Sequence, residues 1–205
     1  MLKHIILTLI FFACHLGFSQ YEWTPAQVIL KNGTSFRGLV KFPIHSGGLV
    51  SIGTTEFKYK KKRKSRVEKY GQETVDKVIF GDEQFATVEY QYVPISKNKS
   101  VLMELMVSGK VNLYTRTVSR YSYNFMENES LPTSSTIDYN SEYYLKREKE
   151  IKATLISGPK IFSSFNQSVK QYFSDCQEIS DYIESDLYDL NNLFQLVDDY
   201  NLLCQ

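Results

Sequence analysis

"AQVILKNGTSFRGLVKF" (residues 26–42) decides the fold, because two β-forming arms flank an Asn-Gly pair at Asn32 and Gly33. Asn and Gly tolerate the positive φ angles that a two-residue hairpin turn requires. With such a turn, Ile29 lies opposite Phe36 and Val28 lies opposite Arg37, so one face is apolar and the other is mixed. This stretch therefore predicts an antiparallel β-hairpin.

The alternation of apolar and polar residues continues outward from this hairpin to about residue 156. The pairs Ser108-Gly109 and Glu148-Lys149 are candidate turns between further strands. Short strands at this spacing are typical of an antiparallel β-barrel or sandwich. We predict additional strands at residues 85–93, 100–107, 111–118, 121–125, 142–147 and 151–156.

After Gly158-Pro159 the apolar period lengthens to about 3.6, which indicates two or three short helices. Asp175 is predicted to cap the second helix and Asp189 the last. The chain is thus expected to be an α+β protein, with an antiparallel β-domain at 22–157 and a helical segment at 158–205. The inner helical faces are predicted to contain Phe162, Phe165, Val169, Tyr172 and Phe173, then Cys176, Ile179 and Ile183, then Leu190, Leu193, Val197 and Tyr200.

The first 19 residues have the layout of a secretory signal peptide, with Lys3 before an apolar run and small residues near Ser19. Cleavage after Ser19 would leave Gln20 at the new N-terminus. A lipoprotein anchored at Cys14 is the alternative. We expect an exported protein, periplasmic or extracellular, which would retain Cys176 and Cys204. Two cysteines in an exported protein most simply form a disulfide; two buried, unpaired thiols are the other interpretation.

The residue types required by several kinds of chemistry are missing from the sequence after residue 19. His45 is its only histidine, which excludes a zinc site built from several His and Cys residues. There is no phosphate-binding Gly-rich loop and no nucleophile elbow. We therefore predict no catalytic, cofactor-binding or metal-binding residues. A pair of carboxylates of the glycosidase kind stays open, because acidic residues are abundant.

A basic run at residues 58–69 contains eight cations and one acid, Glu68, and is expected to form a hairpin with a basic tip. An exported protein does not meet nucleic acid in the cytoplasm, so nucleic acid is not an expected partner. The tip is a solvated loop, a docking surface for anionic glycan or lipid headgroups, or a complement to the eight acids at residues 171–205. The candidate contact residues are Lys60, Lys61, Lys62, Arg63, Lys64 and Arg66.

A second candidate surface is the alternating set Tyr121, Tyr123 and Phe125. Aromatic rings in this arrangement stack on sugars or bases, although they also form the inner face of many sheets. No aromatic contact is assigned on this pattern alone.

Several motifs together resemble uncharacterised exported proteins of Bacteroidota-type bacteria. They are "LKNGTSFRGLVKFP", "YGQETVDKVIFGDEQF", "ELMVSGKVNLY", "YYLKRE" and the tail "YFSDCQEISDYIESDLYDLNNLFQLVDDYN". Where such proteins often continue an Asp-Cys pair with Pro, this chain has Gln177. The resemblance implies a fold and a compartment but no activity.

Taken together, the sequence predicts a non-catalytic envelope protein that acts as a binding or interaction module. A carboxylate-based hydrolase and a structural subunit that associates with itself are the alternatives.

Overall fold

The computed structural model describes residues 23–42, 56–82, 86–124, 134–158 and 164–204. The expected signal peptide with Cys14, the cleavage site at Gln20, and His45 lie outside these residues. The side chains of residues 118–124 and 134–139 also lie outside the description.

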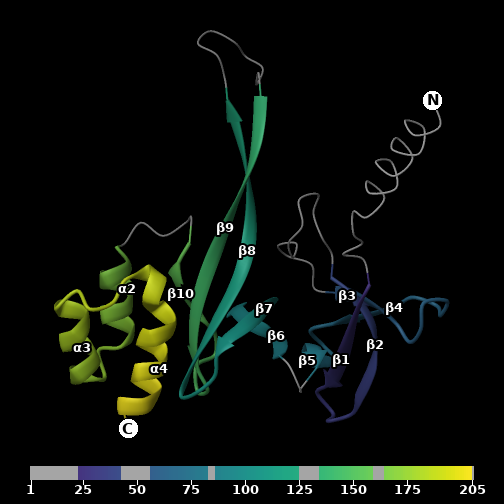
Figure 1. The fold of residues 1–205 in the computed structure, drawn as a ribbon, viewed down its shortest axis with the longest axis horizontal. Helices are drawn as coiled ribbons and strands as arrows, with labels where there is room; N and C mark the ends of the chain where they lie inside the picture. Colours follow the sequence, from purple (N-terminus) through teal and green to yellow (C-terminus); the bar gives the residue numbers. More distant parts are fainter. Residues whose placement is uncertain (1–22, 43–55, 83–85, 125–133, 159–163, 205) are drawn as a thin grey trace, which may run out of the picture.

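Ten antiparallel strands form one sheet in the order β10-β9-β8-β7-β6-β5-β1-β2-β3-β4 (Figure 1). The sheet is not closed, since β10 and β4 are its edges, so the fold is sandwich-like rather than a barrel. The expected α+β class is confirmed. The strands are β1 Thr24–Leu30, β2 Ser35–Lys41, β3 Glu56–Lys60, β4 Glu68–Gly71, β5 Val75–Asp82, β6 Ala86–Ser96, β7 Lys99–Val107, β8 Val111–Asn124, β9 Ser134–Arg147 and β10 Thr154–Ser157.

Two strands expected at 111–118 and 121–125 are one long strand, β8, and β9 begins earlier than expected. The two strands pair along their whole length, from Val111 opposite Arg147 to Asn124 opposite Ser134. The turn at Glu148-Lys149 does not lead directly into a strand, because β10 starts only at Thr154.

The predicted hairpin at residues 26–42 forms, but its predicted register is wrong by one residue. Val28, not Ile29, lies opposite Phe36, and Gln27 lies opposite Arg37. The Leu30 amide donates to the Thr34 carbonyl, and the Gly33 amide donates to the Leu30 carbonyl. Gly33 alone in the turn has a positive φ, at 82°. The connection is thus longer than the expected two residues, which moves every side chain of one arm to a different partner.

Replacing Gly33 with alanine is expected to lower the free energy of unfolding by about 1 kcal/mol. The cost is conformational, because no atom lies within 4 Å of where a Cβ would stand. Urea unfolding measures it. Gly33→Asn is the matched control and should lose less, because Asn tolerates positive φ better than Ala. Equal stability of Gly33→Ala and the wild type would contradict the assigned turn.

Three groups of buried side chains form the core. The first lies among β1 to β6 and includes Val28, Phe57 and Val78. The second includes Met103, Tyr114 and Tyr144. The third joins one face of the sheet, through Leu113 and Leu145, to the helices. The helices are α2 Phe165–Tyr172, α3 Gln177–Glu184, the 3-10 turn η2 Leu190–Asn192 and α4 Leu193–Leu203.

The helices lie at one end of the long axis of the molecule, and strands β1 to β4 lie at the other (Figure 1). Asp189, predicted to cap the last helix, instead caps η2, the 3-10 turn directly before α4, and accepts from the amides of Asn191 and Asn192. Asp175 is not the cap of α3, because that position belongs to Cys176 and Asp175 instead bonds Arg147 and Tyr200. Leu190, expected on the inner face, is 41% exposed.

Candidate functional site

The basic run forms the tip of the β3–β4 hairpin, with residues 61–67 as the connection. Phe57 and Tyr59 alternate into the core and are 1% and 5% exposed. Because successive residues of a strand point to opposite faces, Lys58 and Lys60 point outward. The Ser65 amide donates to the Lys62 carbonyl at 2.9 Å and closes the tip. The core residues therefore fix the hairpin while its cations stay at the surface.

Tyr70 anchors the second arm of the hairpin. Its ring contacts Phe36 and Phe57, and its hydroxyl donates to Glu68 at 2.8 Å. Burial, and then this hydrogen bond to a carboxylate, raise the pKa of Tyr70 to about 12. The phenol is thus neutral at physiological pH, and the charge of the hairpin comes from its Lys, Arg and Glu residues.

Beside the tip lies a hollow of about 420 Å³ on the outer face of β2, β1, β5 and β6, which we call the basic hollow. Gln27 stands between Arg37 and Ile79 in register, so all three share this face, while the neighbouring Val28 points into the core. The residues that line the basic hollow are Pro25, Ala26, Gln27, Arg37, Gly38, Leu39, Lys61, Lys62, Ile79, Gly81 and Thr87.

The described charges of the basic hollow are positive. Arg37, Lys61 and Lys62 are the charged residues among its described lining, and no carboxylate is among them. Glu89, the partner of Ile79 on β6, is engaged by Lys77 at 3.2 Å. Leu39, Pro25 and Ile79 give the hollow an apolar floor. This combination favours an anionic group attached to an apolar or weakly polar body.

The structure brings only part of the predicted contact set to the hollow. Lys61 and Lys62 line it, and the Lys60 ammonium lies 4.3 Å from the centre of the Trp23 ring in a cation–π contact. Arg63, Lys64 and Arg66 are exposed on the tip but are not among the lining residues. The tip thus presents two groups of cations, one in the hollow and one beside it.

Sequence reasoning missed Arg37 and Trp23. The incorrect register placed Arg37 opposite Val28, a core residue, and so hid its position on the outer face. The pairing of Gln27 with Arg37 was the signal that could have found it, because these two polar side chains face each other only in the observed register. Trp23 had no partner that a local pattern could reveal, since Lys60 is distant in sequence.

The predicted aromatic surface at Tyr121, Tyr123 and Phe125 cannot be compared with the structure beyond its backbone pairing. Tyr121 pairs with Ile137 and Tyr123 with Ser135 along the backbones of β8 and β9. Their side chains, and the whole of Phe125, lie outside the described residues. The stacking surface therefore stays a prediction.

A second hollow, of about 450 Å³, lies between β10 and α2 and includes Arg147, Glu150 and Tyr172. Arg147 bonds Glu150 at 3.2 Å and Asp175 at 2.8 Å, and its guanidinium lies 4.3 Å from the centre of the Tyr172 ring. Tyr172 donates to Glu150 at 2.9 Å. Burial, together with that carboxylate, raises the pKa of Tyr172. These groups satisfy one another and join the sheet to the helices.

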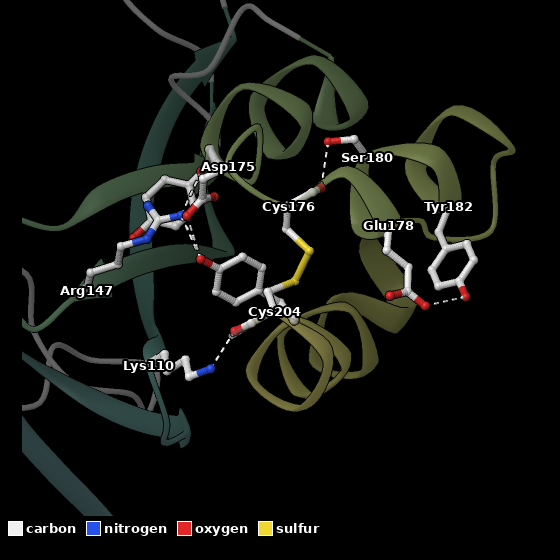
Figure 2. Close-up of a disulfide and its surroundings, with 10 residues drawn as sticks. Lys110, Arg147, Asp175, Cys176, Glu178, Ser180, Tyr182 and Cys204 are labelled. Atoms are coloured by element: carbon white, nitrogen blue, oxygen red, sulfur yellow. Dashed lines mark hydrogen bonds and ion pairs between the residues drawn. A yellow bond between two sulfur atoms is a disulfide. The ribbon is translucent and has the colours of Figure 1, made fainter.

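The disulfide predicted between Cys176 and Cys204 is present in the structure (Figure 2). It ties the residue before α3 to the residue after α4. The Lys110 ammonium donates to the Cys204 carbonyl, so the turn between β7 and β8 holds the same helix end (Figure 2). Asp175, beside the bridge, bonds Arg147 and Tyr200. The helical segment is thus attached to the sheet at both ends of the covalent link.

Within the described ranges, no three His, Cys, Asp or Glu side chains are grouped as metal ligands. Among the described lining residues, the basic hollow has no acid and the second hollow has Glu150 alone. In the same part of the chain, no helix has the length and apolar character needed to cross a membrane. No protein-family model, no curated protein and no solved structure matches this sequence.

Proposed function

We propose that this protein is an exported, non-catalytic binding module that takes anionic groups of envelope glycans or lipids at the basic hollow. The observation that carries this proposal is the described lining, in which Arg37, Lys61 and Lys62 accompany apolar residues and no described carboxylate. We include in the proposal membership of the exported Bacteroidota-type family that the sequence resembles.

The three cations suit phosphate or carboxylate groups for different reasons. A guanidinium such as that of Arg37 presents a planar set of donors that matches two oxygens at once. The ammonium groups of Lys61 and Lys62 act as mobile point charges. The apolar floor formed by Leu39 and Ile79 would contact the body to which the anion is attached. Affinity then depends on both charge and contact area.

The rest of the tip extends the positive surface beyond the hollow. Arg63, Lys64 and Arg66 are exposed, and the described structure gives them no carboxylate partner. A polymer or a headgroup layer that enters the hollow would meet these charges as well. The hydrolase alternative draws no support from either hollow, because the described lining of neither has two carboxylates.

The test compares Lys61→Glu/Lys62→Glu with the wild type in two binding assays at low salt. One probe is polygalacturonate, a soluble anionic polysaccharide; the other is phosphatidylcholine vesicles containing phosphatidylglycerol. Each lysine near an anionic surface contributes about 1 kcal/mol, so losing two and adding two carboxylates should weaken vesicle binding by at least roughly thirtyfold. Binding of wild type should also fall steeply as salt rises.

The matched control is Lys149→Glu/Lys152→Glu, which makes the same change in net charge at two exposed lysines away from the basic hollow. It should bind as the wild type does. Equal binding by all three proteins would show that net charge and the hollow are both irrelevant, and would refute the proposal. Binding to only one of the two probes would assign the ligand to glycans or to lipids.

A further inference from the structure

The outer face of α4 exposes large apolar side chains in the described structure. Phe194 is 38% exposed and Leu202 is 75% exposed, with Asp198 between them at four-residue spacing. Residues four apart lie next to one another on a helix, so these three share a face. Leu190, just before the helix, is 41% exposed. The opposite face is fully packed on the core through Leu193, Leu196, Val197 and Tyr200.

Large apolar side chains that lie exposed next to one another often mark an interaction surface. The same surface is negative, because Asp198 is exposed on this face of α4 and Asp189 is exposed directly before Leu190. Residues 171–205 contain no Lys, Arg or His. We call the set Leu190, Phe194, Leu202, Asp189 and Asp198 the acidic stripe. Its complement must be apolar and positively charged.

The basic hollow has these two properties. Leu39 and Ile79 are among its lining residues, and its described charged residues are all cations. Strands β1 and β2, which carry part of the basic hollow, and helix α4, which carries part of the acidic stripe, lie towards opposite ends of the long axis (Figure 1). No ion pair of the described residues joins the tip to the acidic tail. A contact between them therefore needs two molecules.

We propose that the acidic stripe of one copy docks in the basic hollow of a second copy. The two surfaces are different, so the contact is head-to-tail, and each dimer keeps a free hollow at one end and a free stripe at the other. Addition of further copies can then continue in an open series. Stable complexes bury roughly 1,200–2,000 Å², and we expect the contact of one helix face with one hollow to bury less. The association is therefore weak, depends on concentration and decreases with salt.

This inference shares the basic hollow with the proposed function but does not depend on it. An anionic ligand in the hollow excludes the second copy. Changes in the acidic stripe distinguish the two proposals. They should remove self-association, while the unchanged hollow should still bind polygalacturonate or vesicles.

The test is sedimentation velocity of the oxidised protein at several concentrations in low and high salt. The wild type should show a sedimentation coefficient that rises with concentration in low salt, and polygalacturonate should reverse this rise. Lys61→Glu/Lys62→Glu reverses the charge of the hollow, and Asp189→Asn/Asp198→Lys reverses that of the stripe. Asn is chosen at Asp189 because that residue caps η2 and Asn is also a favoured cap. Each variant alone should associate at least about tenfold more weakly.

An equimolar mixture of the two variants should recover association, because the altered hollow of one then matches the altered stripe of the other. Phe194→Ser should weaken association without a change of charge, and Lys149→Glu/Lys152→Glu should behave as the wild type.

Three results would overturn the inference: a monomeric wild type at all concentrations, no recovery in the mixture, or loss of association in Phe194→Ser but not in Lys61→Glu/Lys62→Glu. The last result would mean that the stripe of one molecule packs against the stripe of a second molecule and not in its hollow. If the stripe variant still binds polygalacturonate or vesicles, the proposed function stands regardless.

Discussion

Replacing Glu142 with glutamine is expected to lower the free energy of unfolding by about 3–5 kcal/mol, because the change leaves a buried guanidinium without its counter-ion. Glu142 is 4% exposed and lies directly opposite Arg116 on the neighbouring strand. Its Oε2 atom accepts from the Arg116 Nε at 2.7 Å and from the Tyr144 hydroxyl at 2.6 Å. Urea unfolding measures the loss.

The Arg116–Glu142 pair is also incompletely satisfied. Within the described part of the chain, Arg116 Nη1 is buried and has no hydrogen-bond partner. An unpaired buried donor costs about 1–3 kcal/mol. Tyr144 accepts from Arg116 Nη2 at 3.0 Å, so all three side chains must be changed together to avoid leaving another polar atom unpaired. Burial and the contact with Glu142 raise the pKa of Tyr144, which keeps it neutral.

The matched control for Glu142→Gln is therefore the triple variant Arg116→Met/Glu142→Leu/Tyr144→Phe. It should be much more stable than Glu142→Gln and close to the wild type, because apolar residues of similar size often replace a buried ion pair without loss. A loss below about 1 kcal/mol in Glu142→Gln would show that solvent reaches the guanidinium. A triple variant as unstable as Glu142→Gln would show that packing, not charge, sets the cost.

The sequence predicted the fold class and several local features, because these depend on signals that are close together in the chain. The alternation of apolar and polar residues predicted most of the strands. The longer spacing of apolar residues after Gly158 predicted the helices. Asp189 was recognised as a cap because both of its bonds are local, although it caps η2 and not the helix α4 that follows. Asp175 was assigned wrongly because its partner, Arg147, lies in a different element. A rule that considers only neighbouring residues does not include an ion pair with a residue far away in the chain.

The candidate site depended on a feature that the sequence specifies only weakly, the register of the first hairpin. Asn32-Gly33 fits a two-residue turn and also the longer turn that is observed, and the two differ by one residue in pairing. The core settles the choice, since the observed register places Val28 and Phe36 on the buried face. It also places Arg37 on the outer face beside the basic tip. The tip was predictable, but the hollow was not.

The helical segment supplies the second large expected effect. Reducing the Cys176–Cys204 disulfide should lower the free energy of unfolding by about 3–4 kcal/mol, because the bond closes a loop with a sequence separation of 28 in the unfolded chain. The helices it joins are short, α3 with 8 residues and α4 with 11, and helices of this length are marginal in water without packing. Urea unfolding with and without reductant measures the change.

The effect of reduction should be largest at the helices. Hydrogen exchange of α3 and α4 amides should accelerate more than that of β8, whose pairing with β9 does not involve the bridge. Cys176→Ala/Cys204→Ala is the matched control: it should have about the stability of the reduced wild type, and reductant should not change it further. If reduction instead leaves both unfolding and exchange unaltered, Phe173 and Tyr200, whose rings lie 4.7 Å apart, hold the helices without the covalent link.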